Sequence, residues 1–191
     1  MNKILENKKV IFLDVGYTLD YPASGEWMLT NKFYEIVGDR INGKDHDEIR
    51  KARHEGIRFL EENHLLKTME EEEAQYTEFY SIVSKELGLG LSLNELKEIA
   101  NDRTYNMENY LTYPETVEAV KKLSESFKLG IISDTWPSIT PQLEHIGVLK
   151  YITFETYSCF LGVFKPDEKI IWMLCQSAGY LHPKPFLSMT E

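Results

Sequence analysis

The sequence predicts an α/β fold in which a parallel sheet has helices between its strands and a helical module follows the first strand. Two mainly apolar runs, residues 9–13 and 128–133, have the composition of strands that are buried on both faces. The long region between them has helical periodicity and helix caps. Beyond it, strand and helix patterns alternate, which is typical of a parallel sheet with right-handed crossovers.

The middle region is predicted to form four helices and no strand. Apolar residues recur at helical spacing in residues 27–37, 46–64 and 69–87. A fourth helix is expected after Ser92, because Glu95 lies three residues later in the pattern of a capping box.

The second half of the chain alternates between helix and strand. The predicted order is a helix in residues 113–127, a strand at 128–133, a helix near 139–146, a strand around 151–156, a helix in 164–179 and the beginning of a fourth strand at 185–189. The chain therefore divides into an α/β core, residues 1–20 and 112–191, and a helical cap, residues 21–111.

Composition narrows the class of protein. The chain has 191 residues with 42% hydrophobic content, enough for a sizeable core. A formal net charge of −10 argues against a nucleic-acid partner, and no apolar stretch is long enough to span a membrane. The segment "MNKILENKK" lacks the apolar core of a signal peptide, and Cys159 and Cys175 have no CxxC spacing. We therefore expect a cytoplasmic protein with reduced thiols.

Two groups of potential ligands are not predicted to bind metal. The four glutamates at residues 70–73 have the character of a solvated helix start. The histidines lack metal-ligand spacing and are expected at the surface or in packing: His46, His54, His64, His145 and His182.

Polar side chains follow the predicted strands where a ligand would bind. Asp14 ends the first strand, Ser133 ends the second, and Lys165 is placed at the start of the helix after the third strand. Ligands of open parallel sheets bind beyond the carboxyl ends of the strands. A carboxylate, a hydroxyl and an ammonium group converging there suit phosphoryl transfer, because the carboxylate attacks while the other two hold the phosphate oxygens.

Three sequence motifs in this order resemble those of the haloacid dehalogenase (HAD) superfamily of hydrolases, in its capped, phosphatase-like branch. They are "VIFLDVGYTL" at residues 10–19, "GIISD" at 130–134 and "KPD" at 165–167. The resemblance implies a Rossmann-like parallel sheet with an inserted helical-bundle cap. It implies that Asp14 is the nucleophile and forms an aspartyl-phosphate, that Lys165 is catalytic, and that Thr18, Ser133 and Asp134 bind phosphate. It also implies Mg²⁺ held by Asp14 and the backbone carbonyl of Gly16.

Gly16 departs from the phosphatase pattern. Phosphatases of this superfamily usually have a second Asp at this position, which serves as the general acid and base. Such a group typically contributes roughly 10²–10⁴-fold in rate. The activity is therefore expected to be weak or limited to good leaving groups, unless Asp20 or Asp134 substitutes.

The C-terminal sequence is the second departure, since the chain stops before the fourth motif of the resemblance is complete. Glu191 falls where an acidic metal ligand is expected; the alternative is a solvated chain end. Without further strands, residues 10–13 would lie at an exposed apolar edge. We therefore expect either a homodimer through this edge or a shortened form with reduced stability.

The resemblance leaves three functions open. The first is a Mg²⁺-dependent phosphohydrolase acting on a small phosphorylated metabolite, and the second is a non-catalytic relative that binds phosphate or a partner. The third is a metal-independent haloacid dehalogenase, although that branch has an aromatic residue at the position of Gly16, and Tyr17 lies one residue later. Substrate specificity is expected to come from the cap, with these candidates: Trp27, Arg40, Lys44 and Arg53.

Overall fold

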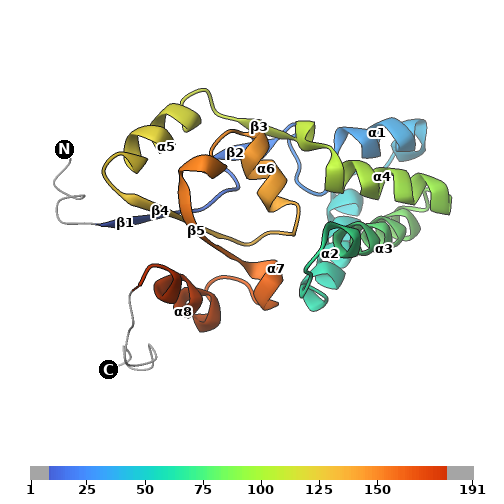
Figure 1. Cartoon of the computed structure of the whole chain (residues 1–191). Coiled ribbons are helices and arrows are strands. Elements are labelled where there is room, and N and C mark those ends of the chain that lie inside the picture. The colour runs from blue at the N-terminus through green and yellow to red at the C-terminus, as the bar shows by residue number, and fades with distance from the viewer. Residues whose placement is uncertain (1–8, 180–191) are drawn as a thin grey trace.

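The core of the protein is a parallel sheet of three strands in the order β1-β4-β5 (Figure 1). This computed structural model describes residues 9–179. The strands are β1 (Val10–Leu13), β4 (Lys128–Ser133) and β5 (Ile152–Tyr157). Both strand pairs are parallel, with Leu13 opposite Ile131 and Ser133 opposite Tyr157. The predicted α/β class and parallel sheet are confirmed.

Helices lie on both sides of this sheet. Helices α5 (Thr116–Ser124) and α6 (Ile139–His145) lie on one side, and α7 (Ser158–Leu161) and α8 (Glu168–Ser177) lie on the other (Figure 1). A short 3₁₀ helix, η4 (Leu149–Tyr151), leads into β5. The sheet core includes buried apolar side chains from strands and helices: Leu129, Ile131, Ile139, Leu143 and Ile170.

The position of Lys165 corrects the predicted helix of residues 164–179. Helix α8 begins at Glu168, so Lys165 lies in the loop between α7 and α8 rather than at a helix start. Pro166 explains the shift, because a proline disfavours helical geometry at the residue before it. The Asp167 side chain then caps the helix by accepting a hydrogen bond from the Lys169 N–H.

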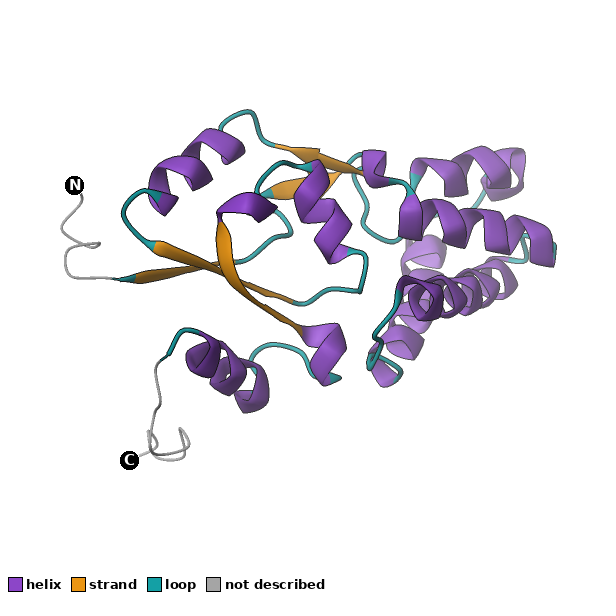
Figure 2. Ribbon diagram, viewed as in Figure 1, coloured by secondary structure: helices purple, strands orange, loops and turns teal. Residues whose placement is uncertain are grey.

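Four α-helices form in the region predicted to be a cap, and they gather at one end of the molecule (Figure 2). They are α1 (Asn31–Val37), α2 (His46–Glu62), α3 (Met69–Leu87) and α4 (Leu93–Tyr105), with the 3₁₀ helix η2 (Gly38–Ile41) after α1. Helices α2, α3 and α4 each begin with a capping box, which satisfies backbone N–H groups that the first turn leaves unpaired. The inner faces of the four helices form a second apolar cluster that includes Phe33, Tyr76, Phe79, Tyr80 and Ile99.

The prediction of no strand in the middle region is wrong at both ends of that region. Strands β2 (Asp20–Pro22) and β3 (Tyr110–Thr112) pair in antiparallel orientation, and the 3₁₀ helix η3 (Met107–Asn109) precedes β3. Three residues are too few to show strand periodicity, and the partners lie far apart in sequence. The two strands pair where the chain enters and leaves the helical region, close to the predicted domain boundaries.

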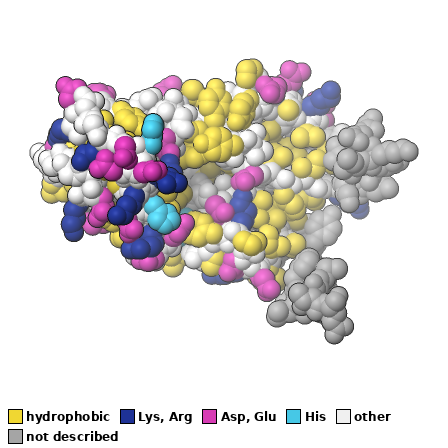
Figure 3. All heavy atoms as spheres, turned by 180° about the vertical axis from the view of Figure 1, so that it is seen from behind, with side chains coloured by type: hydrophobic (Ala, Val, Ile, Leu, Met, Phe, Trp, Pro, Cys, Tyr) yellow, Lys and Arg dark blue, Asp and Glu magenta, His cyan; other side chains and the backbone are white. Residues whose placement is uncertain are grey.

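Strand β1 is less buried than its composition predicts. All four of its residues are only half-buried, because within residues 9–179 this strand lies at the edge of the sheet and pairs with β4 alone. From behind, charged side chains of both signs crowd the helical end, whereas hydrophobic side chains are more frequent over the sheet half (Figure 3). The homodimer through this edge stays a prediction. The expected fourth strand, His182 and Glu191 lie outside the described residues.

The remaining composition-based expectations concern cysteines and membrane spans. Cys159 and Cys175 are both free, and the first is buried while the second is half-buried. No helix within residues 9–179 combines the length and hydropathy that crossing a membrane would need.

A buried glutamate joins the cap to the core. Glu72 is fully buried, so the prediction that residues 70–73 are all solvated is wrong at this position. Helical spacing places Glu72 on the face of α3 that also contains Tyr76 and Phe79. Its carboxylate accepts hydrogen bonds from the backbone N–H and the hydroxyl of Ser138, both at 2.7 Å. Burial raises the pKa of Glu72 to about 7.

We predict that Glu72→Gln stabilises the protein above pH 7 and that this advantage disappears on acidification. The pKa of Glu72 rises from an ordinary value of 4.5 to about 7, so the folded protein holds this proton more tightly than the unfolded chain. Wild-type stability therefore falls as pH rises from about 4.5 to about 7, by up to roughly 3 kcal/mol. Gln cannot ionise and keeps one acceptor and one donor for Ser138.

Urea unfolding at a series of pH values measures this difference. The matched control is Glu78→Gln, because Glu78 is an exposed residue of the same helix, and its stability should follow that of the wild type at every pH. A pH-independent difference between Glu72→Gln and the wild type would contradict the prediction.

Candidate active site

The parallel pairing of β1 and β4 brings Asp14 and Ser133 to the same edge of the sheet. Asp14 directly follows β1, and Ser133 is the last residue of β4. One carboxylate oxygen of Asp14 accepts a hydrogen bond from the Val15 N–H at 2.9 Å. About half of the Asp14 side chain is exposed, whereas Ser133 is buried. The nucleophile predicted from the sequence is therefore accessible to a ligand.

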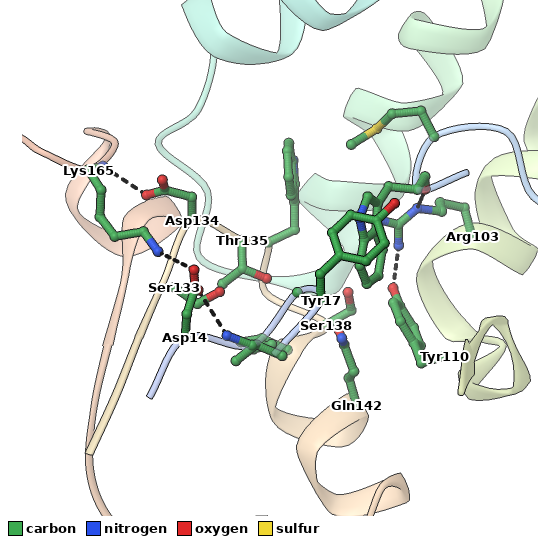
Figure 4. A pocket seen from close by; sticks show the side chains of 16 residues that line it. Asp14, Tyr17, Arg103, Tyr110, Ser133, Asp134, Thr135, Ser138, Gln142 and Lys165 are labelled. Carbon is green, nitrogen blue, oxygen red and sulfur yellow. Dashed lines mark hydrogen bonds and ion pairs between the residues drawn. The ribbon is translucent and has the colours of Figure 1, made fainter. Parts of the chain in front are cut away.

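Lys165 forms an ion pair with Asp14 on the same side of the pocket (Figure 4). Its Nζ lies 2.9 Å from Asp14 Oδ2 and also donates to the Ile132 carbonyl at 3.4 Å. The backbone N–H of Lys165 donates to Asp134 Oδ1 at 2.9 Å, which ties the loop before α8 to the end of β4 (Figure 4). This loop places the ammonium group beside the carboxylate that it is predicted to assist.

Most of the predicted site residues line one pocket of about 270 Å³. They are Asp14, Gly16, Ser133, Asp134 and Lys165. Thr18 is exposed and does not line this pocket; its backbone N–H donates to the Val15 carbonyl within the turn. Glu191, predicted as a metal ligand, lies outside the described residues.

Trp27 occupies the space beside Gly16. A Cβ atom at position 16 would lie 3.3 Å from Trp27 Cζ2, tighter than ordinary van der Waals contact. Tyr17 has a left-handed backbone with φ of 56°, and its ring packs edge-on against the Trp27 indole at a centroid distance of 5.2 Å. Both aromatic rings line the pocket. A second carboxylate at position 16 would therefore require Trp27 to move.

The other three cap candidates do not line this pocket. Arg40 is paired with Glu95 at 2.7 Å, and Arg53 is paired with Glu26. Lys44 is half-buried in the segment before α2. Of the four residues predicted to set specificity, the structure brings only Trp27 to the pocket.

Further residues that line the pocket were not predicted from the sequence. They are Met28, Arg103, Tyr110, Thr135, Trp136, Ser138, Ile139 and Gln142. Arg103 had a detectable signal, because it follows Leu96 and Ile99 at helical spacing and therefore belongs to the buried face of α4. The others lie in loops or short elements, where no periodic pattern exists.

Of the two suggested substitutes for the missing acid, only Asp134 lines the pocket. Asp20 is fully buried and accepts a hydrogen bond from the Gln142 side-chain amide. Burial raises the pKa of Asp20 to about 6 and also raises the pKa of Asp134 above its ordinary value. Asp134 is therefore the candidate proton donor with access to a bound ligand.

His64 is linked through the Ser158 hydroxyl to Thr135, which lines the pocket. Its Nε2 lies 2.7 Å from the Ser158 hydroxyl, and that hydroxyl also accepts the Thr135 N–H at 2.8 Å. The imidazole stacks on Phe164 at 3.9 Å, and burial lowers its pKa to about 4. His64 is thus a neutral packing residue, as expected, whereas three other histidines are exposed: His46, His54 and His145.

The donor atoms at the pocket mouth fit part of a Mg²⁺ site. The Asp14 carboxylate and the Gly16 carbonyl are hard oxygen donors, and the Gly16 carbonyl accepts no hydrogen bond from the described residues. Mg²⁺ needs only one or two carboxylates when substrate phosphate and water complete its shell. Within residues 9–179, no cluster of three or more His, Cys, Asp or Glu side chains is placed to hold a metal.

Several solved structures of other proteins are similar to this structure over most of the chain. A putative β-phosphoglucomutase from Thermotoga maritima matches with a TM-score of 0.62 and 13% identity, over 91% of this chain and 72% of that one. The chain has the haloacid dehalogenase (HAD) fold. The putative HAD-hydrolase YfnB from Bacillus subtilis, bound to magnesium, matches with a TM-score of 0.58 and 14% identity, over 88% of this chain and 71% of that one.

Dehalogenases share the HAD fold as well. The 2-haloacid dehalogenase from Pseudomonas syringae matches with a TM-score of 0.55 and 15% identity, over 90% of this chain and 73% of that one. No family model and no curated protein matches the sequence. The similarity is therefore one of fold, and the chemistry has to be argued from the site.

We predict that Gly16 and Trp27 are energetically coupled. Gly16→Ala should destabilise the fold by roughly 1–3 kcal/mol, because the added Cβ meets the indole at 3.3 Å. Trp27→Leu removes that obstacle, so the double variant should be less destabilised than the sum of the two single variants. Urea unfolding of the four proteins measures the coupling, and strictly additive changes would show that the indole does not restrict position 16.

Proposed function

We propose that this protein is a phosphohydrolase that acts on a small phosphorylated molecule through Asp14. The observation that supports this proposal best is the 2.9 Å ion pair between Asp14 and Lys165 at the mouth of a pocket that Ser133 also lines. A half-exposed carboxylate with an ammonium group beside it can attack phosphorus while the cation offsets the charge of the phosphate oxygens.

The reaction follows from these positions. An oxygen of Asp14 forms a bond to phosphorus, and the bond to the leaving oxygen breaks, with its electron pair going to that oxygen. Lys165 and Ser133 hold the other phosphate oxygens through hydrogen bonds. Water then attacks the phosphorus of the aspartyl-phosphate, which releases inorganic phosphate and restores Asp14. Mg²⁺ held by Asp14 and the Gly16 carbonyl would supply further positive charge at the phosphate.

Gly16 limits the range of leaving groups. No side chain at this position can protonate the leaving oxygen, and Asp134 is the acidic group that lines the pocket. Burial raises the pKa of Asp134 above its ordinary value, and the Lys165 N–H that its carboxylate accepts opposes this rise. We therefore propose that substrates with good leaving groups, such as acyl phosphates or aryl phosphates, react fastest.

A second candidate is dehalogenation, in which Asp14 attacks carbon and halide leaves. Trp27 and Tyr17 favour this candidate, because the Trp27 indole occupies the space where a phosphatase would have its second carboxylate, and the Tyr17 ring packs against that indole. A dehalogenase from Xanthobacter autotrophicus, with chloropropionic acid covalently bound, matches with a TM-score of 0.52 and 16% identity, over 93% of this chain and 67% of that one. Halide is a good leaving group and needs no proton, so this chemistry also tolerates Gly16.

We predict that p-nitrophenyl phosphate is hydrolysed in the presence of Mg²⁺ and that Asp14→Asn abolishes this activity. The amide is a poor nucleophile, so the expected loss exceeds roughly 10²-fold. Phosphate release with Mg²⁺ or with EDTA measures the activity. The matched control is Asp47→Asn, an exposed substitution of the same kind on α2, which should retain wild-type activity.

Two outcomes would redirect the assignment. Chloride release from chloropropionate in EDTA, lost in Asp14→Asn, would identify dehalogenation as the reaction. Equal background from the wild type and Asp14→Asn with both substrates would favour a non-catalytic binding protein.

A further inference from the structure

Arg103 is a buried cation that forms no salt bridge with a carboxylate of residues 9–179. Only 5% of this residue is exposed, yet it lines the same pocket as Asp14. Its Nε donates to the Trp27 carbonyl at 3.0 Å, and its Nη1 donates to the Tyr110 hydroxyl. Among residues 9–179, no Asp or Glu oxygen lies within 4.0 Å of the Arg103 guanidinium. A buried charge without a partner is costly, so this arrangement needs an explanation.

Aromatic rings compensate part of that cost. The guanidinium carbon lies 4.7 Å from the centroid of the Tyr76 ring and 5.6 Å from that of Tyr110. Such cation–π contacts hold an arginine in place but leave its net charge available to another partner.

Two carboxyl groups that act electrostatically on Arg103 are already hydrogen-bonded to other side chains. Glu72 and Asp20 both act electrostatically on Arg103, but Glu72 accepts hydrogen bonds from Ser138, and Asp20 accepts one from Gln142. Burial raises the pKa values of both carboxyl groups, so each keeps its proton to a higher pH than an exposed carboxyl group does. The positive charge of Arg103 is thus only partly balanced by the protein.

Arg103 lies across the pocket from the proposed nucleophile. In Figure 4, Asp14, Asp134 and Lys165 occupy one side, whereas Arg103 and Tyr110 occupy the other, with Tyr17 between them. Nη2 of Arg103 has no hydrogen-bond acceptor among the described residues and is free to bind a ligand. Ser138 and Gln142 add polar groups at this end of the pocket.

We propose that Arg103 binds a second anionic group of the substrate, so that the substrate is a small phosphomonoester that also has a carboxylate or another phosphate. This inference rests on the proposed function, because it takes the phosphoryl group to be at Asp14. A pocket of about 270 Å³ limits the molecule to a few carbon atoms between the two anions. A planar guanidinium suits both carboxylate and phosphate, through paired hydrogen bonds.

Binding of two matched ligands tests the proposal. Phosphoglycerate and glycerol phosphate share a carbon skeleton, but only the first has a carboxylate. Calorimetry with the Asp14→Asn protein, which cannot turn them over, should show a preference for phosphoglycerate of about tenfold or more. Propanediol bisphosphate should also bind better than glycerol phosphate if the second anion can be a phosphate. Equal binding of phosphoglycerate and glycerol phosphate would overturn the proposal, and this comparison requires no substitution at Arg103.

Substitutions at Arg103 assign the preference to this residue. In the same background, Arg103→Gln should abolish the preference, and Arg103→Lys should retain part of it. Tyr76→Phe is the matched control, because it keeps the ring under the guanidinium, and Tyr76 does not line the pocket; its preference should be unchanged. A preference that persists in a folded Arg103→Gln protein would overturn the proposal.

Failure of this inference and failure of the proposed function give different results. p-Nitrophenyl phosphate has no second anion. If the protein hydrolyses it but binds the two matched ligands equally, the phosphohydrolase proposal stands and the proposed role of Arg103 is wrong. If the protein hydrolyses no substrate but prefers phosphoglycerate through Arg103, the anion subsite is supported and the proposed phosphohydrolase function is wrong.

Discussion

The parallel pairing of β1 with β4 is the constraint on which the candidate site depends. Because the two strands run in the same direction with Leu13 opposite Ile131, their carboxyl ends meet at one edge. This register sets the positions of Asp14 and Ser133 relative to each other, independently of the helices. The loop before α8 then needs to supply only one cation, Lys165, to complete a charged cluster at that edge. A shift of register would separate these groups even if every helix formed normally.

The joint between cap and core uses the same residues as the pocket. Trp136 packs against both apolar clusters, and its indole N–H donates to Gln75 at 2.8 Å. Glu72 accepts hydrogen bonds from the backbone N–H and the hydroxyl of Ser138. These buried polar contacts are costly unless all partners are satisfied, so they favour one arrangement of the two halves. The shape of the pocket is therefore coupled to the stability of this joint.

Gly16 and Trp27 show how the residue type at position 16 is linked to a packing contact. The indole fills the space that a carboxylate at position 16 would need, and Tyr17 packs against it. The site consequently combines a charged end, with Asp14 and Lys165, and an aromatic middle. This combination suits chemistry that depends on a nucleophile and a cation rather than on a second acid.

The sequence by itself determined the α/β class and the helical region after the first strand, and it predicted three residues that the structure brings to one pocket, Asp14, Ser133 and Lys165. These features depend on local patterns, since strand composition, helix caps and the residue after a strand are readable without distant contacts. Only the tertiary structure decided that β2 pairs with β3, that Glu72 is buried and that Arg103 reaches the pocket. The physical reason is that each of these depends on groups far apart in the chain, whose proximity no local periodicity encodes.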